Sequence, residues 1–516
     1  MASKRKIMSE PRPRAQPHPA SLFSLIPLNK QTAERIVNHE QNSNLVSFLP
    51  RVENILYPGQ ITRGLNIHLQ IGTKSRYTLA TIGRTGDIYV AGTSISRVQC
   101  SFEIHKDTQE ILLYDRSTTR STQTFGEKAA PFELDRPDRR VVVSDEVNTQ
   151  FGFGGVACDL FKFEIHWHES KSDFQEQIAN REDNPRLTRT VEDEIPTASH
   201  SPRTTLIRPM THAPGIIRYY NKILLGRGSF GEVHKAVNID SGAFFAIKLV
   251  KWPLGGIQSK QYQMLKREVV TIARLSHPNI AEFISAQGEG GPNLEIFTVL
   301  REGNIEDLIK KELFKRHPNL AMSLLNQMLQ ALDYLAVMDT IHRDIKPANI
   351  LYQSLTGGNY TFQLTDFGLC NSIIDARTFA GSPIFMAPEM FSEMFSETPR
   401  QTFKVDVWSL FVTLVYTLNV NGFREKQFAT PASCISAVQE AANDVHFRGI
   451  YDMAIIDPEA RASAGDMLNK LFNGNGRSIP DRRMQRAPAP LQKERNHRID
   501  EPWNLRRIAS DVDMDY

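Results

Sequence analysis

The sequence predicts a multidomain protein in which an all-β sandwich or barrel precedes a globular α/β segment, with disordered termini and a disordered linker. Length is the first reason, because 516 residues exceed a typical single domain. The texture of the chain is the second reason, since short alternating segments fill residues 60–168 and longer mixed segments fill residues 219–472. The composition, 41% hydrophobic and 23% charged, is ordinary for globular proteins and allows sizeable cores.

Residues 60–168 contain seven short segments in which apolar and polar residues alternate, separated by clusters of Gly, Asp, Ser and Thr. The segments are LNIHLQI (65–71), RYTLATI (76–82), DIYVAG (87–92), QCSFEIH (99–105), ILLYD (111–115), RRVVVS (139–144) and FKFEIHW (161–167). Their recurrence at roughly every dozen residues is typical of an all-β sandwich or barrel.

Three stretches flank these domains and lack such patterns. Residues 1–55 are rich in proline, polar groups and early positive charge, and we expect them to be disordered. Residues 169–215 are polar and charged, which predicts a flexible linker. The tail, residues 473–516, carries a basic block before an acidic end, a pattern that is usually solvated and disordered.

The chain shows no signal for a membrane or a secretory compartment. No targeting peptide is visible, and the apolar piece SLFSLIPL (21–28) is too short to span a membrane. The longest apolar run, residues 405–420, is typical of a buried core helix. Four scattered cysteines without ligand spacing fit a reducing compartment and no disulfide framework. We therefore expect a location in the nucleus, the cytoplasm or both, and no membrane partner.

The charge balance bears on nucleic-acid binding. A net charge of +3 offers no global case for it. The arginine-rich tail and N-terminus leave two interpretations open, nucleic-acid binding and nuclear import. Since neither has interleaved aromatic residues beyond Trp503, nuclear import or plain solvation is favoured, and no direct nucleic-acid partner is expected.

Two motifs carry the groups that phosphoryl transfer needs. In IHRDIKPANIL (341–351), Asp344 can accept the proton of an attacking hydroxyl, and Lys346 supplies a cation for the moving phosphoryl group. Asn349, together with Asp366 in LTDFGL (364–369), would hold Mg²⁺ between the phosphates of ATP.

A glycine-rich segment and a buried lysine point to the same chemistry. The segment LGRGSFGEV (225–233) fits a tight strand–turn–strand over phosphates, although this pattern alone also fits dinucleotide-binding folds and ordinary turns. Its glycines are Gly226, Gly228 and Gly231. Lys248 follows in an otherwise apolar strand, where an unpaired ammonium is costly, so we expect it to contact the phosphates and to pair with Glu268. Taken singly, both residues would be ordinary surface charges.

These motifs resemble the catalytic core of eukaryotic protein kinases. The resemblance implies a bilobal α+β protein kinase fold over residues 219–472, with ATP and Mg²⁺ as cofactors and proteins as substrates. It implies that Leu225, Val233 and Ala246 also contact the nucleotide. It further implies two structural contacts, an ion pair between Glu389 and Arg461 and a hold of Asp406 on the catalytic-loop backbone.

The resemblance extends to the acceptor and to regulation. Lys346 and Ser382 match serine/threonine kinases rather than tyrosine kinases. Arg343, next to the catalytic aspartate, implies compensation by a phosphate on the activation loop, and Thr378 matches the position most often used. An ordinary exposed loop hydroxyl is the alternative for Thr378.

Substrate preference is less defined. Basophilic relatives place carboxylates where this chain has Asn304 and Ala348, although Glu302, Glu306 and Asp307 lie nearby in the sequence. The tail motif LRRIAS, ending at Ser510, resembles a site for a basophilic kinase other than this one.

The β region resembles a forkhead-associated (FHA) domain, a β-sandwich whose end loops bind phosphothreonine peptides. The resemblance lies in TIGRTGD (81–87), SISRVQCSFEI (94–104) and LYDRSTTRST (113–122). It implies an FHA-like sandwich in which four residues contact the phosphopeptide, namely Arg84, Ser96, Arg97 and Thr119. Two departures stand out: Gln99 replaces the histidine that braces the family's pocket, and Thr119-Arg120 replaces its Asn-Gly.

Together the domains are similar to the FHA-containing checkpoint and meiotic kinases of the DNA-damage response, in which a phosphothreonine reader brings the kinase to its partner. The absence of Ser-Gln and Thr-Gln pairs from the first 60 residues argues against a close checkpoint relative. A non-catalytic scaffold, with a pseudokinase and a degenerate reader, is the alternative from another class of protein. The intact set of five catalytic residues disfavours it: Lys248, Glu268, Asp344, Asn349 and Asp366.

Overall fold

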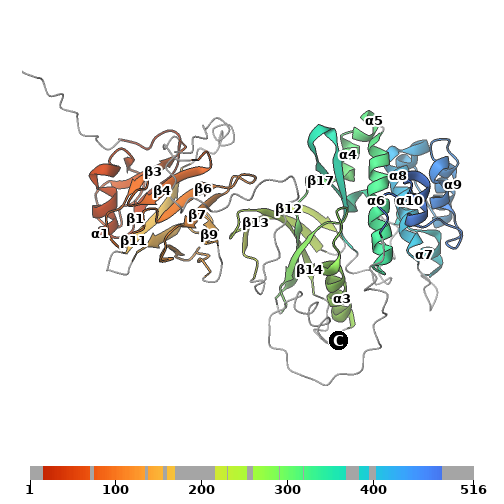
Figure 1. The fold of residues 1–516 in the computed structure, drawn as a ribbon, viewed down its shortest axis with the longest axis horizontal. Helices are drawn as coiled ribbons and strands as arrows, with labels where there is room; N and C mark the ends of the chain where they lie inside the picture. Colours follow the sequence, from red (N-terminus) through yellow and green to blue (C-terminus); the bar gives the residue numbers. More distant parts are fainter. Residues whose placement is uncertain are drawn as a thin grey trace, which may run out of the picture. The chain divides into compact units, whose positions relative to one another are not determined.

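The structure of the chain is a computed structural model that describes most of its length. The described residues are 15–69, 75–133, 138–154, 160–168, 216–228, 231–252, 260–289, 291–317, 319–367, 383–393 and 402–478. The chain divides into two compact units, drawn in Figure 1. One is formed by residues 1–223 and 235–245, the other by residues 224–234 and 246–516.

The first unit is a β-sandwich of two sheets. The larger sheet has the order β2 (Val46–Leu49), β3 (Thr62–His68), β1 (Ser21–Pro27), β11 (Phe161–Trp167), β10 (Gln150–Phe153) and β8 (Gln123–Phe125). The other has the order β5 (Ile88–Tyr89), β4 (Thr78–Gly83), β6 (Cys100–Ile104), β7 (Ile111–Asp115) and β9 (Arg140–Val142). Fully buried phenylalanines from both sheets meet in one core, where the Phe102 ring lies 5.1 Å from Phe23 and 5.4 Å from Phe151. All seven expected segments contribute strands.

The expectation of disorder for residues 1–55 is wrong for the part that the structure describes. Residues 21–27 form β1, which pairs with β3 on one side and with β11 on the other. Phe23 and Leu25 are completely buried. This strand needs no alternating pattern because it is buried in the interior of the sandwich. The same region adds α1 (Lys30–Thr32), η1 (Ala33–Val37), η2 (Glu40–Asn42) and β2.

The first unit also takes in residues 235–245, because Val237 and Ile239 belong to its hydrophobic core. The boundary expected at residue 219 therefore does not coincide with the division into units. Cys100, in β6, and Cys434, in the second unit, are buried free thiols. The expected linker, residues 169–215, lies outside the described residues.

The second unit contains two lobes with separate cores. The smaller lobe is built on a sheet of the order β12 (Tyr219–Gly228), β13 (Gly231–Asn238), β14 (Phe244–Lys251), β16 (Asn293–Val299) and β15 (Phe283–Gln287), with α3 (Lys260–Arg274) against β15. The division into units assigns residues 219–223 of β12, 235–238 of β13 and 244–245 of β14 to the first unit. The apolar face of α3 follows the helical period at Leu265, Val269 and Ile272, which are all buried.

The larger lobe is mostly helical. Its helices are α4 (Ile305–Lys310), α5 (Leu313–Arg316), α6 (Asn319–Val337), α7 (Pro388–Glu393), α8 (Lys404–Leu418), α9 (Pro431–Ala442) and α10 (Ala464–Phe472). Short 3₁₀ turns add η4 (Pro347–Asn349), η5 (Thr356–Gly358), η7 (Pro383–Phe385), η8 (Val420–Glu425) and η9 (Arg448–Ala454). A small sheet of β17 (Gly303–Asn304), β18 (Ile350–Ser354) and β19 (Tyr360–Leu364) carries the ends of the catalytic segments.

Helix α6 packs against both α8 and α10, as Figure 1 also shows. As the sequence predicts, α8 is buried on nearly all sides, which explains its apolar composition. Within the described ranges, none of the helices has the length and apolar character needed to cross a membrane.

Candidate functional site

One buried carboxylate holds the backbone at the start of the catalytic loop, residues 341–351, in place. Asp406, at the start of α8, accepts hydrogen bonds from the backbone N of His342 at 2.7 Å and of Arg343 at 2.8 Å. This is the contact that the sequence predicts. Burial raises the pKa of Asp406, while His342 and Arg343 act in the opposite direction. Arg343 has a φ of 68°, a left-handed conformation that non-glycine residues adopt only when their surroundings enforce it.

Asp344 lies beyond this anchor with a cation and an amide beside it. Lys346 Nζ donates to its two carboxylate oxygens at 2.8 and 3.0 Å. Asn349 Nδ2 donates to Asp344 Oδ2 and to the Asp344 carbonyl, both at 2.8 Å. These contacts fix the carboxylate in one orientation, as a group that accepts a proton from a bound hydroxyl requires.

The next group follows β19. Thr365 N donates to the carbonyl of Asn349 at 2.9 Å, which joins this segment to the catalytic loop. Asp366 has a φ of 61° and forms an ion pair with Lys248 of β14. The two lobes therefore contribute to one cluster of Lys248, Asp366, Asn349 and Asp344.

The donor set of this cluster fits magnesium. Asn349 and Asp366 offer amide and carboxylate oxygens, which hard cations such as Mg²⁺ prefer. Among the described residues, no group of three or more His, Cys, Asp or Glu could hold a metal without help. Mg²⁺ is commonly held by one or two protein side chains together with the phosphates of a nucleotide.

The glycine-rich segment spans the end of β12 and the start of β13. Gly231 has a φ of 142°, and a Cβ there would lie 2.0 Å from the carbonyl oxygen of Leu249, so only glycine fits. Around Gly226, a Cβ would meet nothing within 4 Å, and Leu225 is 53% exposed. Val233 and Ala246 are half-buried on the neighbouring strands. This open apolar surface suits an aromatic base.

A second buried ion pair ties the segment after the catalytic cluster to the lobe. Arg461 donates to the two carboxylate oxygens of Glu389 at 2.6 and 2.9 Å, and its side chain is 0% exposed. The remaining guanidinium bonds go to the carbonyls of Ile455, Ile456 and Lys404. The predicted pair between Glu389 and Arg461 is therefore present.

A comparison with known protein families identifies the domain that contains this cluster. Residues 219–473 match the model of the protein kinase domain. These residues are a protein kinase domain. Putative serine/threonine-protein kinase A of Trypanosoma brucei brucei is 32% identical over 283 residues, which cover 51% of this chain and 62% of that protein. Cell division control protein 7 of Schizosaccharomyces pombe is 33% identical over 200 residues, which cover 38% of this chain and 18% of that protein.

The chain thus covers less than two thirds of the length of these relatives. Among solved structures, the crystal structure of Rad53 1–466 in complex with AMP-PNP is similar with a TM-score of 0.46 and 18% identity, over 78% of this chain and 93% of that chain.

Three residues that the sequence assigns to the kinase domain are not placed. The side chain of Glu268, in α3, lies outside the described residues, and so do Thr378 and Ser382. The pairing of Lys248 with Glu268 and the regulatory role of Thr378 therefore stay predictions. Among the described side chains, Asp366 forms an ion pair with Lys248.

The acidic residues near Asn304 take part in local structure. Asn304 and Asp307 form a reciprocal capping box at the start of α4. The Glu302 carboxylate accepts from the backbone N and the hydroxyl of Ser354 at 3.0 and 2.6 Å. Both carboxylates are thus engaged within the domain, and the expected lack of an acidic pair for substrate arginines stays a prediction.

Two contributors were missed by the sequence reasoning. Phe367 packs against the cores of both lobes, and its ring lies 4.8 Å from that of His342. The His342 ring also faces the carbonyl of Thr365 at 2.9 Å, with its other nitrogen accepting from Asp344 N at 3.2 Å. Both residues lie within the motifs IHRDIKPANIL and LTDFGL, so their place in these motifs was the available signal.

In the first unit, the loops with the expected phosphopeptide residues are joined by hydrogen bonds. Arg84 Nε donates to the carbonyl of Ile95 at 2.6 Å, and Arg84 N donates to the carbonyl of Ser96 at 3.2 Å. Thr85 N donates to the carbonyl of Arg97 at 2.9 Å. Arg84 and Arg97 are exposed, as is Thr119 on the next loop.

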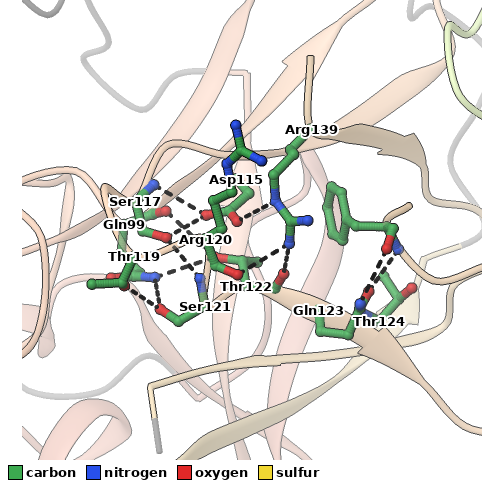
Figure 2. A network of polar contacts seen from close by, with 11 residues as sticks. Gln99, Asp115, Ser117, Thr119, Arg120, Ser121, Thr122, Gln123, Thr124 and Arg139 are labelled. Atoms are coloured by element: carbon green, nitrogen blue, oxygen red, sulfur yellow. Dashed lines mark hydrogen bonds and ion pairs between the residues drawn. The ribbon is translucent and has the colours of Figure 1, made fainter. Parts of the chain in front are cut away.

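That next loop, residues 117–122, rests on a buried polar network shown in Figure 2. Asp115 and Arg139 form an ion pair of 2.8 Å with side chains only 0% and 5% exposed. Arg139 Nη2 then donates to the carbonyls of Arg120 and Thr122 at 3.1 and 3.0 Å. Arg120 has a φ of 51°, so the loop turns sharply at this point.

Proposed function

We propose that this protein is an active serine/threonine kinase that transfers the γ-phosphoryl group of ATP to serine or threonine hydroxyls of protein substrates. The observation that carries the proposal is the cluster of Asp344, Lys346, Asn349, Asp366 and Lys248, together with the kinase-domain match of residues 219–473. Each residue has a separate role in the reaction.

Asp344 accepts the hydroxyl proton as the acceptor oxygen bonds to the γ-phosphorus and the bond to the β,γ-bridging oxygen breaks, so that ADP leaves. Lys346, which already donates to Asp344, lies close enough to neutralise charge on the transferred group. Bound Mg²⁺ would supply charge neutralisation between the phosphates, held by Asn349 and Asp366.

For this reaction, Lys248 must contact the phosphates of the nucleotide. Its ammonium forms an ion pair with Asp366, and we infer that it also contacts the α and β phosphates of ATP. The side chain of Lys248 is 14% exposed, so its charge acts in a partly desolvated site.

The kinase activity is tested by a peptide-array assay with Mg²⁺ and labelled ATP. We expect Lys248→Met to lower phosphorylation by about a hundredfold or more, because it removes a preorganised cation from the phosphates. Lys251→Met is the matched control, since Lys251 is exposed on the same strand. A wild-type protein that binds Mg·ATP without transferring phosphate would instead identify a scaffold.

We further infer that the β-sandwich reads phosphothreonine and brings the kinase to phosphorylated partners. The observation that favours this second function is the hydrogen-bonded cluster of loops that presents Arg84, Arg97 and Thr119 at their exposed surface. Arginine and hydroxyl groups bind phosphate through short, charge-assisted hydrogen bonds. A role in DNA-damage signalling and a nuclear or cytoplasmic location stay predictions.

The reader is tested by binding of the full chain to phosphothreonine peptides with randomised flanks. We expect Arg84→Ala to weaken binding by about tenfold or more, because a hydrogen bond to a charged group is lost. Arg51→Ala, an exposed arginine outside these loops, should leave binding unchanged. Equal binding of phosphorylated and unphosphorylated peptides would contradict the assignment.

A further inference from the structure

Gln99 lies at the centre of the loop cluster and is completely buried. Its backbone N donates to the carbonyl of Ile82 at 2.7 Å, and its carbonyl accepts from Arg116 N at 3.0 Å. The main chain of Gln99 is therefore held on both sides by neighbouring strand ends. Its side chain therefore starts from a fixed position between the loop that contains Ser96 and the loop of residues 117–122.

The side-chain amide of Gln99 can sit in only one orientation. Ser96 N, which can only donate, faces Gln99 Oε1 at 3.2 Å. Gln99 Nε2 then faces Ser121 Oγ at 2.9 Å and Thr122 Oγ1 at 3.3 Å, as Figure 2 shows for this loop. A flipped amide would bring two donors together at Ser96, which costs a buried hydrogen bond.

This orientation determines what the hydroxyls of the loop can do. A hydroxyl has one proton and two acceptor positions. Ser121 Oγ accepts from Gln99 and lies 3.1 Å from Thr119 Oγ1. Whichever of the two hydroxyls donates to the other, one proton of the pair is left over. Neither hydroxyl has a further partner among the residues that the structure describes.

The leftover donor sits on an ordered, accessible loop. Thr119 is exposed and Ser121 is half-buried. The backbone on both sides is held by Arg139, through the carbonyls of Arg120 and Thr122, and Ser121 N donates to Ser117 Oγ at 2.9 Å. A fixed donor of this kind suits a ligand that offers only acceptors, such as the oxygens of a phosphate or a peptide carbonyl.

We propose that Gln99 is a positioning residue that makes the Thr119–Ser121 hydroxyl pair a hydrogen-bond donor toward an acceptor oxygen of a bound phosphothreonine peptide. The proposal rests on the phosphothreonine-reading function proposed above, and it adds Ser121 to the peptide contacts. Because an amide does not titrate, the donor is present throughout the physiological pH range. A histidine at this position accepts from Ser96 only while it is neutral.

The test is a titration of the full chain, at pH 8, with the phosphothreonine peptide that binds most tightly among those with randomised flanks. Gln99→Met keeps the volume of the side chain but removes both polar ends, and Ser121→Ala removes the hydroxyl. We expect each to weaken binding by about tenfold, as loss of a bond to a charged ligand does. The double variant, Gln99→Met with Ser121→Ala, should bind about as well as whichever single variant binds less tightly, because both changes remove the same donor.

Two further variants separate hydrogen-bond polarity from packing. Gln99→His can accept from Ser96 and donate to Ser121, so it should bind within about threefold of the wild type when the imidazole is neutral. Gln99→Glu has the shape of glutamine but no donor for Ser121, so it should not restore binding. Gln60→Met, at an exposed glutamine, is the matched control.

The outcomes distinguish this proposal from the one on which it rests. If Gln99→Met and Ser121→Ala bind like the wild type while Arg84→Ala does not, the role of Gln99 is overturned and the reader stands. If the wild type binds no phosphothreonine peptide, both are overturned. If Gln99→Met does not fold, the contrast between Gln99→His and Gln99→Glu and the effect of Ser121→Ala decide the question.

Discussion

Replacing Asp344 by Asn is expected to lower kcat by about 10²- to 10⁴-fold, the usual contribution of a general base. The variant keeps the shape of the side chain but loses the carboxylate that accepts the hydroxyl proton. Asn349 Nδ2 and Lys346 Nζ, both donors, converge on this carboxylate, so an amide there can satisfy only part of their bonding. The lost activity is measured with a peptide substrate under saturating Mg·ATP.

Nucleotide binding provides the internal check on this result. Among the described residues, Asp344 bonds to one proposed Mg²⁺ ligand, Asn349, by accepting from Asn349 Nδ2. Asp344→Asn keeps an oxygen that can accept this bond, so the dissociation constant for Mg·ATP should change by less than about threefold. The matched control is Asp339→Asn, at an exposed aspartate with a φ of 51°, a conformation that asparagine tolerates well. Wild-type activity in Asp344→Asn would refute the role of Asp344 and restore the scaffold interpretation.

The catalytic cluster was predictable because its spacing is local. Asp344, Lys346 and Asn349 lie within one short loop, and the motif around Asp366 follows along the same chain. Even the long-range hold of Asp406 on this loop could be expected from the resemblance. By contrast, the ion pair between Lys248 and Asp366 depends on how the two lobes meet, which no local pattern specifies.

Seven strands of the β-sandwich were predictable, but β8, β10 and the strands before residue 55 were not. Strands of three or four residues, such as β8 and β10, are too short for a periodic signal. Strand β1 is short and apolar inside a stretch whose average composition is polar, so that composition concealed it. For Gln99, the sequence indicated only that it replaces a histidine. Its side-chain hydrogen bonds join loops that are distant in the sequence, so no local pattern could predict them.

Replacing Arg461 by Met is expected to lower the free energy of unfolding of the kinase domain by about 3–5 kcal/mol. The change removes the guanidinium from the Glu389 carboxylate, which is 11% exposed, and removes donors from the carbonyls of Ile455, Ile456 and Lys404. Because the chain has two units, the free energy should be read locally, by hydrogen exchange of peptides from α8 in increasing denaturant.

A surface ion pair of similar length supplies the control for this prediction. Lys470 Nζ lies 2.7 Å from Asp452, with both side chains 43% exposed, and Lys470→Met should cost less than about 1 kcal/mol. Removing both buried charges, in Arg461→Met with Glu389→Met, should recover part of the loss, because no unpaired charge then remains buried. If Arg461→Met and Lys470→Met cost the same, burial does not govern the Glu389–Arg461 pair, and its role in holding α7 against the lobe must be rejected.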